Sequence, residues 1–254
     1  CVGSSGHKFC MKCLNIRAHK SLMALEDGEN LLVSDVIEFE KLDLATDADI
    51  WKAMDRLEAL KPTMKAAPFA KHQTALGFTY HEHTICSDRS LRAYFRPAST
   101  WMHDWMHLFV VAGIVNTALY WRMEAFAAAG YGYDRFREYL SLYSWPRSVS
   151  GGKHMGDVFS EERVKNSRKA RTIKMVASEA VSVLPVIATF VKMVIAPRGL
   201  CPNACTVIVL LALLIQTLQD IPHGEVLGSE VLEQVQAFLV AFVAAFGIEH
   251  LHPK

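Results

Sequence analysis

An acid and a histidine three positions apart open one of the most apolar stretches of the chain. Asp104 and His107 fall within the sequence Trp-Met-His-Asp-Trp-Met-His, which also sets His103 four positions before His107. Side chains three or four positions apart share one face of a helix, so such a pair is able to hold a metal ion or to exchange a proton. The simpler alternative is a helix start, with the acid placed at the positive end of the helix dipole.

Two cysteines near the beginning of the chain offer further metal ligands. Cys10 and Cys13 form a Cys-x-x-Cys pair in a glycine-containing segment, an arrangement that turns two thiolates toward one ion. No second Cys-x-x-Cys pair follows, so other ligands would have to complete the site, and the candidates are His19, Cys1 or the Asp104 and His107 pair. The alternative is two thiols in a loop that binds no metal.

A basic run without acids lies in the second half of the chain and leads to a lone glutamate. Clustered cations of this kind contact the phosphates of a polyanion, and counterion release drives the binding. Glu179 follows in an apolar helix, where it either ligates a metal ion or pairs with Lys174 or Arg171. The candidate DNA-binding residues are Arg163, Lys165, Arg168, Lys169, Arg171 and Lys174.

Bulk properties set the limits for these sites. The 254 residues carry a net charge of +1, so any binding of nucleic acid must depend on a local patch. The six cysteines are not spaced as in a secreted disulfide scaffold. We see no signal peptide behind Cys1 and expect a nuclear or cytoplasmic protein. Because the chain opens on a cysteine, we interpret it as a fragment.

The periodicity of apolar residues predicts a mainly α fold. A polar linker is expected over residues 66–96, and a helix over residues 47–60 is expected to start behind Thr46 and to end before Pro62. The other predicted helices are 104–129, 133–142, 161–190 (kinked at Pro185), 203–219 and 230–246 (closed by Gly247).

Three apolar stretches support a rival interpretation as a multi-helix membrane protein. Residues 105–121, 199–219 and 235–248 carry few charges, and the second of these is long enough to span a bilayer. Its continuous apolar block is nearer a dozen residues, with Pro202, Asn203 and glutamines at its edges. This length favours a buried core helix.

The order of the motifs resembles that of a known family. The motifs that carry this similarity are, in order, Gly3-x-x-Gly6-x-x-x-Cys10-x-x-Cys13, Asp104-x-x-His107 and the basic run leading to Ser178-Glu179. On these motifs the chain is similar to the latter part of DDE transposases of the CACTA and Plavaka/Kyakuja types. The closing Phe242 to Lys254 segment also resembles that group.

The resemblance implies a ribonuclease-H-like core interrupted by a helical insertion. On this basis residues 1–20 would form a Cys-x-x-Cys knuckle and residues 21–160 the insertion. Residues 161–254 would form a C-terminal helical part that carries the third catalytic acid.

The resemblance also implies the roles of single residues. Glu179 matches the third of three carboxylates that hold Mg²⁺ for attack at DNA phosphates. Cys10, Cys13, Asp104 and His107 match motifs of the insertion, where they would share a Zn²⁺ ion. The first two catalytic aspartates would lie upstream of Cys1, so we expect this chain alone to bind DNA but to be catalytically inactive. Self-association is a further expectation.

Overall fold

The structure is a computed structural model that describes residues 12–15, 37–100, 104–111, 113–149, 151–221, 224 and 226–250. The chain divides into two compact units, Cys1–Met102 (unit 1) and His103–Lys254 (unit 2). The described residues are mainly helical and contain no strand, apart from a single bridge between Cys13 and Leu44. The predicted mainly α class is confirmed. The boundary predicted after residue 160 falls inside unit 2.

Unit 1 is built on helix α1 (Asp47–Leu60), with the bounds that the sequence predicts. Thr46 caps the helix reciprocally: its hydroxyl accepts from the backbone N–H of Asp49, and the Asp49 carboxylate accepts from the backbone N–H of Thr46. The apolar face of α1 packs onto a small core. The buried residues of that core are Ile50, Met54, Leu57, Phe69, Phe78 and Ala98.

The remaining helices of unit 1 are short, and two of them lie within residues 66–96, where the sequence predicts a linker. Helix α2 (Ala66–Leu76) buries only Phe69 and Ala75, so its period is hard to see in the sequence. It ends at Gly77, whose φ of 81° suits glycine. The other short helices here are η3 (Phe39–Lys41), η4 (Lys61–Thr63) and η5 (Arg89–Ala93).

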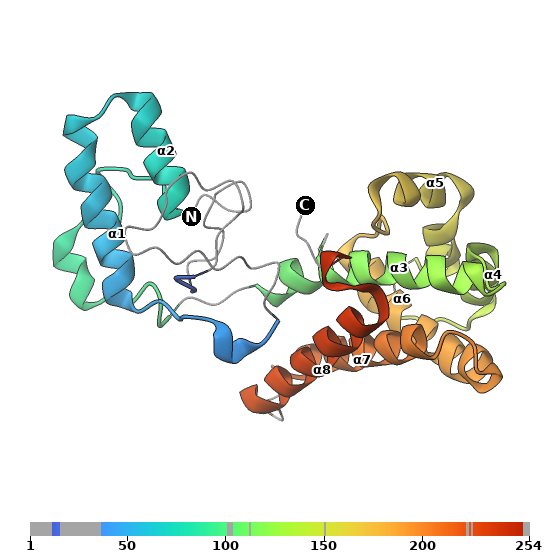
Figure 1. Cartoon of the computed structure of the whole chain (residues 1–254). Helices are drawn as coiled ribbons and strands as arrows, with labels where there is room; N and C mark the ends of the chain where they lie inside the picture. Colours follow the sequence, from blue (N-terminus) through green and yellow to red (C-terminus); the bar gives the residue numbers. More distant parts are fainter. Residues whose placement is uncertain are drawn as a thin grey trace. The chain divides into compact units, whose positions relative to one another are not determined.

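Unit 2 is a layered helical bundle (Figure 1). Helices α7 (Pro202–Asp220) and α8 (Gly228–Phe246) pack along each other, and α7 also packs against α3 (Ile114–Ala128) and α6 (Ala177–Phe190). The short helix η7 (Gly152–Phe159) packs on α4 (Tyr133–Leu142), which in turn contacts α6. Helices α4, α7 and α8 lie where they are predicted. The chain's last described helix is η11 (Ile248–His250).

The prediction of one continuous helix over residues 104–129 is wrong. A π-helical turn, η6 (Met106–Val110), is separated from α3 by a break at Gly113. A Cβ atom on Gly113 would lie 2.2 Å from the carbonyl oxygen of Leu108. Only glycine therefore permits the close backbone approach that turns the chain into α3.

The helix predicted over residues 161–190 is also two helices. Helix α5 (Glu161–Ala170) ends at Arg171, which has a left-handed φ of 52°, and α6 begins six residues later. Pro185 lies inside α6. The helix then continues through a π-helical turn, η8 (Val191–Ile195), into η9 (Ala196–Arg198).

Among the described residues of unit 2, one charged side chain is buried in the core. Arg122 of α3 is fully buried, and its guanidinium donates to the carbonyl oxygen of Ala118. It lies within 5.9 Å of the ring centres of Phe238, Phe242 and Phe246 on α8. Its Nε and Nη2 atoms have no hydrogen-bond partner among the described residues. Burial lowers the pKa of Arg122 to about 9.

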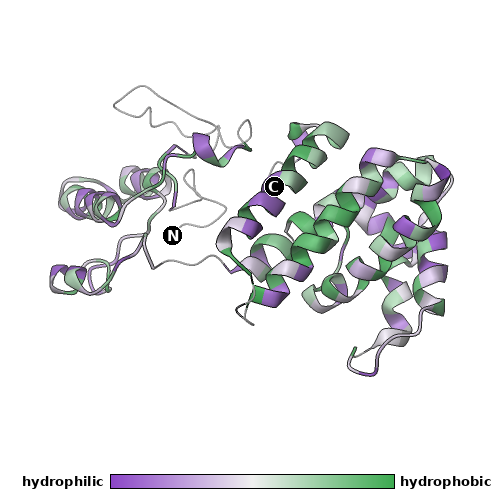
Figure 2. Cartoon of the chain, turned by 90° about the horizontal axis from the view of Figure 1, so that it is seen from below, coloured by the Kyte–Doolittle hydropathy of each residue, from purple (hydrophilic) through white to green (hydrophobic). Residues whose placement is uncertain are grey.

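Hydrophobic residues run along the helices of unit 2 (Figure 2). Within the described ranges, three helical segments are long and apolar enough to cross a membrane, by length and composition alone: Ala177–Arg198, α7 and α8. The three segments differ in the buried share of their own most apolar stretch: this share is 50% in Ala177–Arg198 and 44% in α7, but only 11% in α8. The first two therefore serve as core helices of the bundle.

Candidate functional site

Helix α5 and the segment after it present the basic run on the surface of unit 2. Glu161 and Glu162 occupy the first turn of α5 and Arg168 and Lys169 the last, which suits the helix dipole. Ser167 is buried, so this side of α5 faces the bundle. The cations of the run divide into those that hold α5 in place and those that point to solvent.

Arg163 holds the start of α6. Its Nη1 and Nη2 atoms donate to the two carboxylate oxygens of Glu179 at 2.9 and 2.7 Å, and Nη2 also donates to the carbonyl oxygen of Lys174. The hydrogen bonds from Arg163 are the main reason that the pKa of Glu179 lies below its usual range. The same pairing raises the pKa of Arg163. Glu179 is thus in an ion pair, with Arg163 in place of the Lys174 or Arg171 named from the sequence.

Arg168 holds the end of α5 against α3 and α4. Its Nε atom donates to Glu124 Oε1 at 3.0 Å, and the guanidinium lies over the ring of Tyr133. The same carboxylate oxygen accepts a hydrogen bond from the Tyr133 hydroxyl at 2.8 Å. Burial and this hydrogen bond raise the pKa of Tyr133. Arg168 is therefore a structural cation in this structure.

The segment between α5 and α6 alternates between the core and solvent. Ile173 and Met175 are buried, whereas Lys174 and Val176 are exposed. Buried Asn116 of α3 fixes the segment: its carbonyl oxygen accepts from the N–H of Ile173, and its side-chain amide donates to the carbonyl oxygen of Met175. These contacts force Lys174 outward.

Four cations of the run remain, and we call them the α5 cationic surface. Lys165 and Lys169 stand four positions apart on α5 and share a face, while Arg171 and Lys174 lie in the segment that follows. All four are exposed. No ion pair joins any of them to a carboxylate in the part of the chain that the structure describes.

Comparisons with known proteins add no relative. No family model, curated protein or solved structure matches the chain.

Asp104 and His107 contact each other at the start of η6. Nδ1 of His107 donates to one carboxylate oxygen of Asp104, and the other oxygen accepts from the backbone N–H of Met106 at 2.9 Å. The hydrogen bond from His107 is the largest contribution to the lowered pKa of Asp104. Both side chains are exposed. The contacts have the geometry expected for an acid that caps a helix start.

The predicted zinc ligands are distributed over both units. Cys13 is buried in unit 1, where residues 12–14 pair with residues 43–45, and Cys10 lies outside the described residues. Asp104 and His107 belong to unit 2. Among the described residues, no three His, Cys, Asp or Glu side chains gather in one place. A shared zinc site stays a prediction.

Sequence reasoning missed the residues that hold the α5 cationic surface in position. Glu124 and Asn116 lie on α3, more than forty positions before the groups they bind. Asn116 and Arg122 are polar residues at buried positions of the mainly apolar helix α3, and such residues were the available signal. Asn116 contacts the segment after α5, and Arg122 contacts α8.

Proposed function

We propose that this chain is a segment of a DDE transposase of the CACTA or Plavaka/Kyakuja type that binds DNA through the α5 cationic surface. In this proposal the helices of unit 2 belong to a ribonuclease-H-like core with its insertion, and an N-terminal Cys-x-x-Cys segment forms a knuckle. The observation that carries the proposal is the set of four exposed cations without a carboxylate partner among the described residues, directly before Ser178-Glu179. The motif order supports the family.

The charge balance of this region favours a polyanion. Residues 161–174 contain six cations and two acids, and the acids stand at the opposite end of α5 from Arg168, Lys169 and the segment that follows. A rigid α5 holds Lys165 and Lys169 about one helical turn apart, which suits contacts with neighbouring phosphates of a DNA backbone. Such contacts fix position on DNA without reading its sequence.

The described residues do not fit the magnesium site that the family implies. Both oxygens of Glu179 accept hydrogen bonds from Arg163, so a positive charge lies where a cation would bind. In the described parts of the chain, Glu179 belongs to no group of three or more His, Cys, Asp or Glu side chains that could hold a metal ion. A catalytic role for Glu179 would require further carboxylates beside it and release of Arg163. We therefore propose DNA binding without strand cleavage.

The salt dependence of duplex binding tests the proposal. If four cations each displace about one counterion from B-DNA, the slope of log K against log salt is roughly −3.6. Fluorescence anisotropy with a labelled duplex measures this slope for the full chain. Replacing Lys165 and Lys169 by glutamine should halve it, and replacing Arg171 and Lys174 as well should abolish measurable binding.

A matched variant controls for net charge. Lys52, Lys65, Lys71 and Lys192 are exposed cations that do not belong to α5 or to the segment after it, and their replacement by glutamine removes the same charge. This control should retain binding and its slope within experimental error. Equal losses in the two fourfold variants would contradict the proposal, because binding would then follow total charge and not a defined surface.

A membrane protein is the second candidate function, and one observation favours it. Helix α8 is apolar enough to span a bilayer, yet only 11% of its most apolar stretch is fully buried inside the protein. Leu232 and Val240 are exposed on it. Membrane fractionation of the expressed chain separates the two candidates. Recovery in the soluble fraction without detergent supports the transposase segment, and extraction only by detergent supports the membrane protein.

A further inference from the structure

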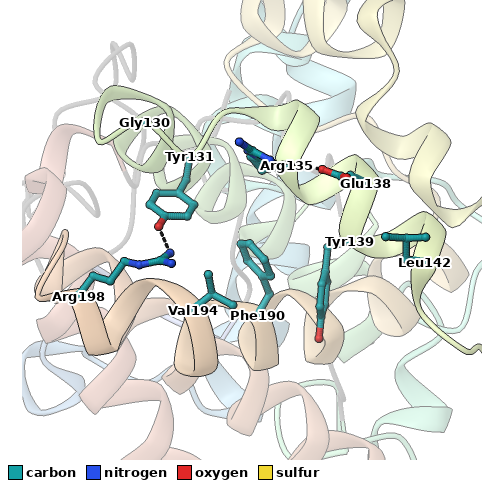
Figure 3. A pocket seen from close by; sticks show the side chains of 9 residues that line it. All are labelled: Gly130, Tyr131, Arg135, Glu138, Tyr139, Leu142, Phe190, Val194 and Arg198. Atoms are coloured by element: carbon teal, nitrogen blue, oxygen red, sulfur yellow. Dashed lines mark hydrogen bonds and ion pairs between the residues drawn. The ribbon is translucent and has the colours of Figure 1, made fainter.

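A pocket in unit 2 lies apart from the α5 cationic surface. It has a volume of about 490 Å³ and opens between α4, the turn before it and the continuous helix formed by the end of α6, η8 and η9 (Figure 3). Gly130, whose φ of 88° suits glycine, lines the pocket in the turn before α4. A volume of this size matches sites for small organic ligands.

Aromatic rings line this α4–α6 pocket. Phe190 is buried at its base, and Tyr131 and Tyr139 lie on either side of it (Figure 3). The ring centres of Tyr139 and Phe190 are 4.7 Å apart, and those of Tyr131 and Phe190 are 6.5 Å apart. Both tyrosines are partly exposed, so each offers ring surface to a ligand. A planar aromatic group is the ligand that such a lining accepts best.

The polar groups of the pocket carry a net positive charge. Arg198 lies over the ring of Tyr131 and donates to its hydroxyl, and no ion pair links Arg198 to an acid within the described residues. Arg135 is paired with Glu138 at 3.6 Å, but both side chains are more than 60% exposed, so this pair contributes little. One arginine is thus available for an anion beside the aromatic lining.

The helix that forms the base of the pocket is irregular at the same place. Residues 191–195 form a π-helical turn, in which Ala196 donates to the carbonyl oxygen of Val191. Val194 of this turn lines the pocket. Single π-helical turns are rare and occur frequently at functional sites. This observation is independent of the aromatic lining and of the charge.

We propose that the α4–α6 pocket binds an unpaired nucleotide, with the base against Tyr139 and the phosphate at Arg198. Stacking on aromatic side chains beside a cation is how proteins bind nucleotides without reading sequence. The nucleotide comes either free from solution or from single-stranded DNA. The second source rests on the proposed function, since a transposase meets unpaired ends, whereas the first does not.

Two probes distinguish the sources. Binding of deoxythymidine monophosphate to the full chain is measured by calorimetry, and binding of a short labelled oligothymidylate by anisotropy. Tyr139→Leu removes the ring but keeps an apolar side chain, and we expect it to weaken binding about tenfold. Arg198→Gln should have an effect of similar size, because it removes the charge that binds the phosphate. Lys192→Gln removes an exposed cation of the same helix that does not line the pocket, and should change affinity less than about threefold.

Crosslinking places the bound base. An oligonucleotide that contains 5-iododeoxyuridine should crosslink under ultraviolet light to Tyr139 or Tyr131, and peptide mapping identifies the residue. The proposal is supported if the unchanged chain binds either probe and this binding is lost in Tyr139→Leu and Arg198→Gln. No binding of either probe, or equal affinity in all three variants, overturns it.

The result is separable from the test of the α5 cationic surface. The fourfold glutamine variant of that surface should lose duplex DNA and retain the mononucleotide. If duplex binding persists while both nucleotide probes fail, only the pocket assignment falls. If the probes bind in the pocket while duplex binding fails, only the proposed function falls.

Discussion

The ion pair between Arg163 and Glu179 permits a quantitative test of how α5 is held. Arg163→Gln and Glu179→Gln each remove one charge while keeping a polar side chain that forms hydrogen bonds. In Glu179→Gln, the side-chain carbonyl oxygen can still accept from the backbone N–H of Val176, as the Glu179 carboxylate does at 3.0 Å. A double-mutant cycle over the two replacements therefore isolates the pairwise interaction.

The size of the coupling follows from exposure and geometry. The Arg163 and Glu179 side chains are 31% and 23% exposed. Exposed pairs contribute about 0–1 kcal/mol, and loss of one partner of a buried pair costs about 3–5 kcal/mol. Two charge-assisted hydrogen bonds in this intermediate setting should couple by about 2 kcal/mol. As a matched control, Arg135 and Glu138 are 68% and 62% exposed and should couple by less than about 0.5 kcal/mol.

Hydrogen exchange measured by mass spectrometry on peptides from α5 and α6 reads the stability of this region in the full chain. The dependence on pH provides a second measurement. Because pairing lowers the pKa of Glu179, its stabilisation is present above the ordinary value of 4.5 and is lost as the pH falls through the lowered folded pKa. A coupling below about 0.5 kcal/mol at neutral pH, or one that persists in strong acid, would refute the pairing.

Three other replacements test features outside that pair. Arg122→Met should stabilise unit 2 by about 1–3 kcal/mol. The lowering of the Arg122 pKa from 12.5 to about 9 corresponds to a free-energy cost of about 5 kcal/mol for burying the charge, and the surrounding aromatic rings offset only part of that cost. A lower melting temperature of the variant would contradict this. Gly113→Ala should destabilise the chain by about 2 kcal/mol or more, since its Cβ would meet the Leu108 carbonyl; an unchanged thermal melt would show that the break at Gly113 is not required. If the zinc prediction holds, elemental analysis will find zinc in the purified chain. Cys13→Ser should lose this zinc, whereas Cys205→Ser, a control at another buried thiol, should keep it. A chain without metal would contradict the prediction.

The helices predicted correctly are those whose start, end and apolar period are all marked by residues in or next to the helix itself. Thr46, Asp49 and Pro62 fix the start and end of α1, and Gly247 follows the last residue of α8. Helix α4, bounded by glycines before it and by Pro146 after it, lies where it is predicted. In these cases the cap residues and the apolar period both lie within the segment itself.

Other features depend on contacts that the local sequence does not contain. The break before α3 arises because the Leu108 carbonyl approaches Gly113, and nothing in the apolar run between them indicates it. The partner of Glu179 is sixteen positions away, because the chain after α5 folds back and brings α5 beside the start of α6. An acidic residue in an apolar helix predicts that a cation pairs with it. Which cation does so depends on the path of the loop between α5 and α6.

Likewise, the composition of the basic run predicts a cluster of six cations, and the fold divides it. Arg163 and Arg168 are occupied by carboxylates of α6 and α3. The sequence could not show this, because Glu124 lies on an apolar helix far from the run. The α5 cationic surface is accordingly smaller than the run from which it was predicted.

The alternation between α5 and α6 also limits how this region of the protein can change. Replacement of Lys174 by another polar residue leaves the buried positions untouched. Deletion of one residue between Arg171 and Ala177 would shift the two-residue period, turn Lys174 toward the core and bring Ile173 to the surface. Substitutions should therefore be tolerated at the outward positions, whereas the length of the segment should be invariant among functional variants of this protein.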